Sequence, residues 1–338
     1  MITTKELAEL AGVNQSTVSR SLSNSQHISK ETRDKIQELA KAHGYTKNKK
    51  KSSHSNGGIV IILNAKKMQN KVLDLYIEHL CNHVIEQTEA HNYFSIILSD
   101  DGSEKALKHI ISVIKSGVSA GVVIINDDYN AALEEALGLC KIPRVYTQYF
   151  SRPMKKSVNV IDMDHFAGGL IATKHLISLG HTRIATLTNV GSSDFSERTT
   201  GYLTALEENS IPSNADWIID AGLTYPSGYK SLEMNWDKIS DCTAFFAQTD
   251  PVAFSLINFL KDRGFSVPEQ YSVMGFDGLQ EGIYFRPELS TVVQPIDEIA
   301  KMSLNRLTRL IDQEDTKATH SFVQPKLLLR ASTAPPLE

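Results

Sequence analysis

Five polar residues lie between positions 15 and 20, and their types suit recognition of a double-stranded nucleic acid. They are Gln15, Ser16, Thr17, Ser19 and Arg20. Glutamine forms paired hydrogen bonds with adenine, arginine binds guanine or phosphate, and hydroxyl groups bind bases or phosphates. A solvated helix face has a similar composition, so the side chains alone leave both interpretations open.

The charge distribution favours nucleic-acid binding over a merely solvated face. Residues 1–56 contain ten Lys and Arg against five Asp and Glu, a net charge of +5. The rest of the chain contains 25 against 34, a net charge of −9. A basic front end on an acidic chain is typical of a DNA-binding module joined to a domain with another role.

Three short helices are expected to position these side chains. A capping-box pattern, Thr3 followed three residues later by Glu6, predicts a helix that ends at Gly12. A second helix is predicted over residues 15–22, and a third from a cap at Ser29 to His43. The residues expected to face inward are Leu7, Leu10, Ala11, Val18, Leu22, Ile36, Leu39 and Ala40. Two short helices joined by a tight turn form the helix-turn-helix layout, whose second helix enters the major groove.

After this module the composition of the chain changes twice. Residues 46–58 contain no apolar side chain and read as a linker. From residue 59 onward, short β-branched runs alternate with segments of helical periodicity. Strands are predicted at residues 59–63, 94–98, 122–125, 144–146, 158–161, 184–187, 217–219, 244–247 and 272–275, and helices at residues 76–90, 105–115 and 168–179. The alternation predicts parallel sheets with helices on both faces, and nine strands favour two α/β lobes over one sheet.

Ligands bind beyond the carboxyl ends of parallel strands, so a cleft between two lobes would gather several strand ends around one small molecule. The candidates at or near strand ends are Asn64, Asp101, Asn126, Gln148 and Ser193. Three aromatic residues, Phe195, Trp217 and Phe276, are candidates for stacking on a sugar face, although each is also an ordinary core residue.

Several classes of protein are disfavoured by what the chain lacks. It has no apolar run long enough for a membrane span and no hydrophobic signal region at its start, so a cytoplasmic location without a membrane partner is expected. No metal-ligand spacing, no cofactor motif and no nucleophile motif occurs, which argues against an enzyme. Adjacent carboxylates at residues 100–101 and 127–128 keep a nucleoside or glycoside hydrolase as a remote alternative, although loop caps are the favoured interpretation.

On its motifs the chain resembles the lactose-repressor (LacI/GalR) family of bacterial transcription regulators. The segment LAELAGVNQSTVSR at residues 7–20 is followed by ISKETR at residues 28–33 and by Gly44 and Tyr45. Later landmarks are HLISLGHTRIA at residues 175–185, SVMGFD at residues 272–277 and PELSTV at residues 287–292. The resemblance therefore covers nearly the whole chain.

The resemblance implies a fold and a set of partners. It implies an α/β protein with an all-α helix-turn-helix headpiece at residues 1–45, a basic linker or degenerate hinge at 46–57, and a core at 58–338. The core resembles periplasmic sugar-binding proteins, with an N-lobe at about 58–158 and 292–322 and a C-lobe at about 159–291 and 323–332. A homodimer would read a near-palindromic operator, and a small effector between the lobes would set the affinity for DNA.

Site residues follow from the resemblance position by position. Gln15 and Ser16 match base-reading residues, and Arg20 matches a DNA contact. The remaining expected DNA-side residues are Thr3, Thr17, Ser19, Asn24, His27, Ser29, Thr32, Tyr45, Asn48, Lys49, Lys50 and Lys51. Arg198 and Asp250 match a pair that binds ligand hydroxyls, for which a guanidinium and a carboxylate in a dry cleft are suited. An interlobe salt bridge without ligand is the alternative interpretation of this pair.

The linker departs from the family pattern. Members usually carry a hinge helix with an apolar wedge that kinks the operator. Here Lys51 and His54 occupy the positions of its Ala and Leu, which predicts less DNA bending, stronger salt dependence and weaker coupling between ligand and DNA. The expected effector is a sugar or sugar phosphate, and the alternative is a purine or nucleoside that acts as a corepressor.

Overall fold

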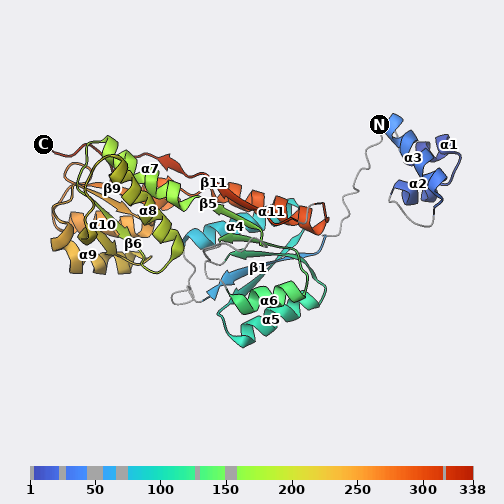
Figure 1. The fold of residues 1–338 in the computed structure, drawn as a ribbon, viewed down its shortest axis with the longest axis horizontal. Helices are drawn as coiled ribbons and strands as arrows, with labels where there is room; N and C mark the ends of the chain where they lie inside the picture. The colour runs from blue at the N-terminus through green and yellow to red at the C-terminus, as the bar shows by residue number, and fades with distance from the viewer. Residues whose placement is uncertain are drawn as a thin grey trace. The chain divides into compact units, whose positions relative to one another are not determined.

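The computed structural model describes residues 4–22, 28–43, 56–65, 75–125, 130–148, 158–314 and 317–337, and the structural statements below concern these residues (Figure 1). The chain divides into two compact units, Met1–His54 and Ser55–Glu338. Each unit has a hydrophobic core of its own. In its described residues the first unit is helical, whereas the second contains two sheets.

The first unit is built from three short helices, as predicted. They pack around Leu7, Val18 and Ile36, each no more than 1% exposed. At the start of the third helix, the Ser29 side chain accepts a hydrogen bond from the Thr32 amide at 3.3 Å, which caps the helix. The helices are α1 Thr4–Ala11, α2 Gln15–Leu22 and α3 Lys30–Ala42.

The first helix confirms one detail of the prediction and corrects another. Gly12 ends α1 with a φ of +67°, a left-handed conformation that glycine adopts without steric cost. Leu10, which was expected to face inward, is 53% exposed, whereas Ala8 is buried. The small core covers only a narrow face of α1, formed by Leu7, Ala8 and Ala11. Leu10 lies about 100° around the helix from the middle of that face and therefore reaches solvent.

Two six-stranded sheets form the second unit. The first has the strand order β11-β5-β4-β3-β1-β2, and all of its pairs are parallel. The second has the order β12-β10-β9-β8-β6-β7, in which β12 alone runs antiparallel. The strands are β1 Gly58–Asn64, β2 Phe94–Asp100, β3 Ser119–Ile125, β4 Arg144–Gln148, β5 Val160–Met163, β6 Ile184–Thr188, β7 Ile218–Asp220, β8 Ala244–Ala247, β9 Ser272–Asp277, β10 Ser290–Val293, β11 His320–Val323 and β12 Lys326–Leu328.

Helices cover both faces of each sheet (Figure 1), and we call each sheet with its helices a lobe. Along β1 the side chains of Ile59 and Ile61 join the cluster that contains α4 and α11, whereas Val60 and Ile62 join the cluster that contains α5 and α6. In the second lobe, α7 and α8 cover one face and α9 and α10 the other. The helices are α4 Leu75–Ala90, α5 Glu104–Lys115, α6 Ala131–Leu139, α7 His165–Ser178, α8 Ser193–Glu208, α9 Tyr225–Ile239, α10 Asp250–Asp262 and α11 Ile296–Ile311, with short turns η2 Ala215–Trp217 and η3 Gln280–Tyr284.

The described chain crosses between the lobes after β5, after β10 and after β11. The sequence placed the first crossing near residue 158, but β5 still pairs with β4 and β11 in the first sheet. It placed the second near residue 291, whereas β10 pairs with β9 along its whole length. Hydrophobic pattern locates a strand but carries no information on which sheet it joins.

Nine predicted strands correspond to β1 through β9, whereas β10, β11 and β12 were not predicted. The missing strands are three or four residues long. β11 and β12 lie at sheet edges. β11 contains only two apolar residues, and the run from Leu327 to Leu329 in and after β12 is short and exposed, so neither resembles a buried strand. They exist because pairing with a neighbouring strand satisfies their backbone groups, which is a tertiary cause.

The helices α7 and α8 approach each other backbone to backbone. A Cβ atom on Gly169 would lie 2.0 Å from the carbonyl oxygen of Arg198, and one on Gly201 would lie 2.2 Å from that of Phe166. A Cβ on Gly168 would lie 2.7 Å from the ring of Phe276. Only glycine fits at these three positions, so this helix contact fixes where α8 and its side chains lie.

We expect Gly169→Ala to lower the free energy of unfolding by about 2 kcal/mol, because the added methyl overlaps the backbone of α8 and forces the helices apart. The matched control is Gly138→Ala in α6, where the added Cβ would meet only Arg144 Nη2, at 3.9 Å. That variant should be neutral or more stable by about 0.5 to 1 kcal/mol. Urea denaturation of both variants measures the difference, and equal stabilities would contradict the packing account.

Candidate functional site

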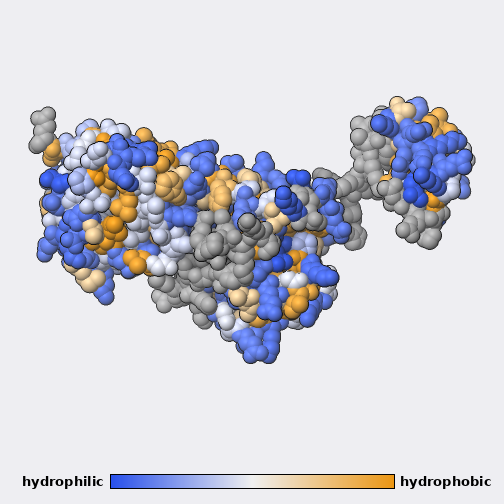
Figure 2. Space-filling model, viewed as in Figure 1, coloured by the Kyte–Doolittle hydropathy of each residue, from blue (hydrophilic) through white to orange (hydrophobic). Residues whose placement is uncertain are grey.

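The outer face of α2 carries polar side chains, as the sequence predicts. Gln15 and Arg20 are exposed, and Thr17 is half-buried. The visible surface of the first unit is largely hydrophilic (Figure 2). Ser29 and Thr32 serve the cap of α3, since their hydroxyl groups are hydrogen-bonded to each other at 2.8 Å.

Part of the predicted site lies outside the described residues. On the DNA side these residues are Thr3, Asn24, His27, Tyr45, Asn48, Lys49, Lys50 and Lys51, together with the side chains of Ser16 and Ser19. On the ligand side they are Asn126 and the side chain of Gln148. The linker expectations for Lys51 and His54 fall in the same category.

The second lobe brings three of the predicted ligand residues together. Arg198 is 3% exposed, and its guanidinium carbon lies 4.4 Å from the ring centre of Phe195 and 3.8 Å from that of Phe276. Phe195 and Arg198 lie on α8, and Phe276 lies near the carboxyl end of β9. Two aromatic faces around a cation give favourable electrostatics without satisfying its hydrogen bonds.

The Arg198 guanidinium also donates hydrogen bonds to three protein acceptors. Its Nε donates to His165 Nδ1 at 3.3 Å, its Nη1 donates to the carbonyl oxygen of Gln248, and its Nη2 donates to Asp194 Oδ2 at 3.5 Å. Asp194 is buried and also accepts a hydrogen bond from Ser192. A guanidinium has five N–H groups, so donors remain for a ligand after these three bonds.

Asp250 lies next to this cluster but does not pair with Arg198. Its Oδ1 accepts from the Thr291 hydroxyl at 2.7 Å, and its Oδ2 accepts from the Leu279 amide at 2.7 Å. Burial raises the pKa of Asp250 to about 7, although the hydrogen bonds of Thr291 and of the Leu279 and Gly278 amides, and the charge of Arg330, lower it.

Arg198 and Asp250 both belong to the second lobe, because α8 and α10 both pack on the second sheet. The interlobe salt bridge that served as the alternative interpretation of this pair is therefore wrong. The predicted role of the two residues in ligand binding stays a prediction. The geometry assigns them different environments: Arg198 lies between aromatic rings, and Asp250 accepts hydrogen bonds from its own lobe.

Asp277 is a neighbouring residue that the sequence places at a strand end, beside Phe276, but that was not among the predicted ligand-binding residues. It ends β9 with a φ of +127°, a strained conformation for a residue with a side chain. Its Oδ2 accepts from the Asp250 amide at 3.2 Å, and its Oδ1 accepts from Gln294 Nε2 at 2.7 Å. Gln294 is 2% exposed, and its Oε1 has no hydrogen-bond partner among the described residues. The sequence signal was present, since an acidic residue directly follows a buried strand.

The first-lobe candidates have structural roles in their loops. Asn64 ends β1 and lies in register with Asp100. Asp100 is buried and accepts from the Gly102 amide and from Asn130 Nδ2, both at 2.9 Å. Asp101 is exposed, and its hydrogen bonds with Ser103 lower its pKa. The adjacent carboxylates at 100 and 101 are thus loop caps, which was the favoured interpretation.

Trp217 and Ser193 are the other two candidates in the second lobe. Trp217 belongs to η2, before β7 begins, and packs with the cluster on the α9 and α10 face. Phe276 packs on the opposite face, with α7 and α8, so the two rings do not share a site. Ser193 is the first residue of α8 and is half-buried. The sequence did not reveal on which face of the sheet Trp217 packs.

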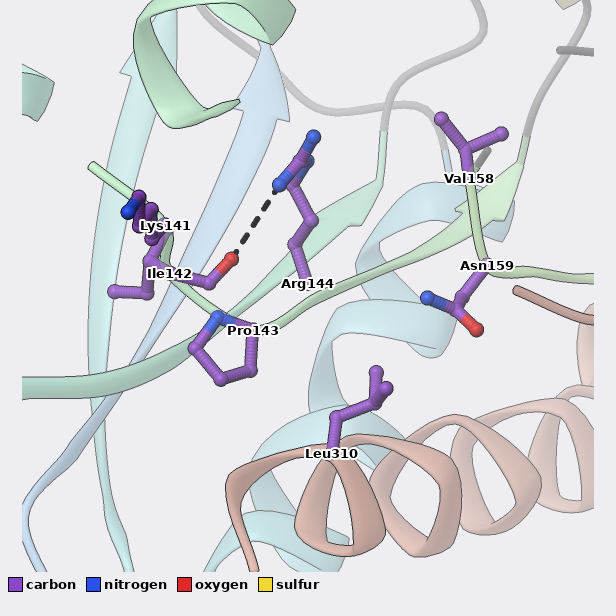
Figure 3. Close-up of a pocket in the computed structure, with 7 residues that line it drawn as sticks. All are labelled: Lys141, Ile142, Pro143, Arg144, Val158, Asn159 and Leu310. Carbon is purple, nitrogen blue, oxygen red and sulfur yellow. Dashed lines mark hydrogen bonds between the residues drawn. The ribbon is translucent and has the colours of Figure 1, made fainter. Parts of the chain in front are cut away.

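A shallow hollow in the first lobe lies away from this cluster. It has a volume of about 230 Å³ and is lined by Lys141, Ile142, Pro143, Arg144, Val158, Asn159 and Leu310 (Figure 3). All of these residues except Leu310, which lies on α11, precede or begin β4 or β5, so the hollow lies at the amino ends of the strands. Arg144, at its rim, is paired with Glu134. The hollow is therefore at the end of the sheet opposite to the one where ligands bind in such folds.

Neither a metal site nor a membrane-spanning helix is found among the described residues. No group of three or more His, Cys, Asp or Glu side chains there is placed to hold a metal ion. No described helix has the length and hydrophobicity needed to cross a bilayer. All three cysteines are free: Cys81 and Cys242 are buried, which raises the pKa of both thiols, and Cys140 is half-buried.

Comparison with protein families gives two matches along the chain. Residues 3–48 match the family described as bacterial regulatory proteins, lacI family. Residues 173–333 match a periplasmic binding protein-like domain. The first match covers all three helices of the first unit, and the second covers most of the second lobe, together with α11, β11 and the crossings after β10 and β11.

Curated relatives align over almost the full length. A ribose operon repressor from Haemophilus influenzae is 26% identical, with 98% of each chain covered. The transcriptional repressor PurR from Mannheimia succiniciproducens is 24% identical, again with 98% of each covered. The transcriptional regulator MalR from Clostridium butyricum is 27% identical, with 97% of this chain and 98% of the relative covered.

Solved structures share the fold. The regulator CelR in complex with cellobiose has a TM-score of 0.74 at 23% identity and covers 98% of this chain and 100% of its own. A LacI family regulator from Enterococcus faecium with bound ribose has a TM-score of 0.70 at 24% identity and covers 82% of this chain and 99% of its own.

We expect the free energy of unfolding to fall as pH rises, because the Asp250 carboxyl is buried. Its folded pKa of about 7 lies above the ordinary value of 3.8, so the folded state binds the extra proton between these values. The contribution is fully present below about pH 4 and is lost as pH rises through about 7. Asp250→Asn should remove it. Urea titrations of both proteins at about pH 5 and about pH 8 test this, and parallel losses of stability in the two proteins would contradict it.

Proposed function

Because the chain belongs to the lacI family of bacterial regulatory proteins, we propose that it is an operator-binding repressor whose affinity for DNA is set by a small ligand bound in the core. The observation that carries the proposal is the Arg198 cluster. A buried guanidinium, two aromatic faces and acidic neighbours meet at the carboxyl ends of parallel strands. That is where small molecules bind in doubly wound sheets.

The proposed division of labour follows the two units. Residues 1–45 form the DNA-binding domain, residues 46–57 the linker, and residues 58–338 the effector-binding core. Gln15, Ser16 and Arg20 read or contact the operator, and the other DNA-side candidates bind phosphates or cap helices. Access to chromosomal DNA places the protein in the cytoplasm. The basic linker, with Lys49, Lys50 and Lys51, adds salt-dependent phosphate contacts.

For the ligand we propose an uncharged sugar. Three carboxylates, Asp194, Asp250 and Asp277, are buried here. The cations that act on them are Arg198, which bonds to Asp194, and Arg330, whose charge acts on Asp250, and this excess of carboxylates disfavours a phosphate group. The buried Gln294 Oε1 is an acceptor that a ligand hydroxyl would satisfy. Ribose is a good first probe, since one relative is named a ribose operon repressor and one similar structure holds ribose.

A purine or nucleoside is the second candidate ligand. It is favoured by the Phe195 and Phe276 rings, which both lie against Arg198, and by relatives named PurR. In that case the ligand would strengthen operator binding instead of weakening it. We infer binding without turnover in either case, because Asp100 and Asp250, two of the buried carboxylates, accept hydrogen bonds from the protein. Incubation with inosine and analysis for free hypoxanthine and ribose tests that inference.

Arg198→Ala should abolish the effect of ligand on operator binding and leave the basal affinity for DNA intact, because Arg198 is buried in the second lobe. Arg20→Ala should weaken operator binding by about tenfold or more while the ligand still raises the melting temperature. Gel shifts on DNA beside the protein's own gene, together with thermal shifts, measure both. Arg198→Lys, which keeps the charge, controls for folding. Loss of DNA binding in a folded Arg198→Ala protein would overturn the division of labour.

We also propose a homodimer, since two headpieces on a two-fold axis read a near-palindromic operator. Hydrophobic residues reach the surface of the second unit in several places (Figure 2). On the edge strand β2, Phe94 and Ile97 are 39% and 50% exposed beside unpaired backbone groups. An apolar sheet edge of this kind is a surface for a second copy.

Ile97→Glu should shift the protein from dimer to monomer in sedimentation velocity and weaken operator binding, because it places a charge on the proposed contact. Leu139→Glu is the matched control, since Leu139 is an exposed apolar residue on α6 and lies outside the β2 edge. It should change neither property. A wild-type protein that sediments as a monomer at micromolar concentration would contradict the proposal.

A further inference from the structure

His165 lies between the lobe crossing and the candidate ligand site. It is the first residue of α7, two residues after β5 of the first sheet ends, and it is 1% exposed. Its Nδ1 lies 3.3 Å from Arg198 Nε, and its Nε2 lies 3.7 Å from Asp162 Oδ1. Its ring stacks beside Phe276, with 6.4 Å between centres and 23° between planes.

The contact with Arg198 fixes the protonation state of the imidazole ring. The Nε atom of a guanidinium only donates, so His165 Nδ1 must accept and carries no proton. The ring proton is then on Nε2, the nitrogen that faces the Asp162 carboxylate. A second proton on Nδ1 would remove the acceptor and set a positive ring against the Arg198 cation.

The charged groups around His165 come from three elements. Asp162 belongs to β5, and Asp164 caps α7 through a hydrogen bond from the Ala167 amide at 2.8 Å. Arg198 belongs to α8, with Asp194 bonded to its far side. From β9 the Phe276 ring packs against both His165 and Arg198 and offers no charge. Arg198 is therefore the group whose position depends most directly on the state of the His165 ring.

We propose that His165 is a positioning residue for the ligand site: its neutral ring accepts the Arg198 Nε–H group and holds the guanidinium in place. The proposal rests on the proposed function, in which Arg198 binds the ligand. Removal of the acceptor should therefore weaken ligand binding. Because His165 directly follows the crossing from β5, the same residue ties Arg198 to a segment that connects the two sheets.

The test follows the Arg198 Nε–H group itself and needs no ligand. Full-length protein labelled with ¹⁵N is studied at one fixed pH, and the Arg198 Nε–H signal is assigned by its loss in Arg198→Lys. Its hydrogen-exchange protection is measured relative to exposed Arg20 in the same spectrum. We expect protection in the wild-type protein and a loss of about tenfold when the acceptor at residue 165 is removed.

Two variants separate positioning from packing. In His165→Asn an amide oxygen replaces Nδ1 as the acceptor, so protection should persist. In His165→Leu the core stays filled but the acceptor is gone, so protection should be low. Protection that persists in His165→Leu, or protection that is lost equally in both variants, would overturn the proposal.

Titration with D-ribose tests whether the contact between His165 and Arg198 affects ligand binding. In thermal-shift titrations, His165→Asn should bind ribose with wild-type affinity, and His165→Leu should bind about tenfold more weakly. If the wild-type protein does not bind ribose, the proposed ligand is wrong, and the exchange measurement still decides the role of His165. Ribose binding by His165→Leu at wild-type affinity would overturn that role.

Discussion

The buried Arg198 guanidinium is the group on which the second lobe's site depends. Transfer of a charge from water to the protein interior costs several kcal/mol unless acceptors and favourable electrostatics compensate. Here compensation comes from Asp194, from His165, from the carbonyl oxygen of Gln248 and from two aromatic faces. These groups belong to α7, α8, β9 and the segment after β8, so four parts of one lobe must hold their positions together. The glycine contact between α7 and α8 makes that precision possible.

The same cluster reaches the crossings between the lobes. His165 follows the crossing from β5, and Gln294 lies in the crossing from β10, where it binds Asp277. A ligand that engages Arg198 or Gln294 therefore acts on groups whose backbone connects the two sheets. Such a ligand binds one lobe orientation better than another and shifts the population toward it by its difference in affinity. This difference in affinity is all that regulation of the DNA-binding unit requires at the ligand site.

Sequence reasoning was most successful where local chemistry decides structure. The α2 and α3 helices and strands β1 to β9 follow from apolar periodicity and caps, of which Ser29 is an example. The sequence did not reveal β10, β11 or β12, because their existence depends on pairing partners distant in the chain. At the site, Arg198 and Phe276 were identified, but the partners His165 and Gln294 were not. Those two side chains acquire their roles only when the crossings bring separate elements together, and no local spacing encodes that.

The most direct test of the account is the affinity of the full-length protein for DNA beside its own gene, measured by fluorescence anisotropy with and without saturating ligand from a panel of sugars and purines. The account predicts that one ligand changes the operator dissociation constant by about 5- to 150-fold, which is the usual range of coupling between two sites. A sugar that weakens binding would identify an inducible repressor, and a purine that strengthens it would identify a corepressor. A ligand that binds the core tightly and leaves the operator affinity unchanged would contradict the central claim.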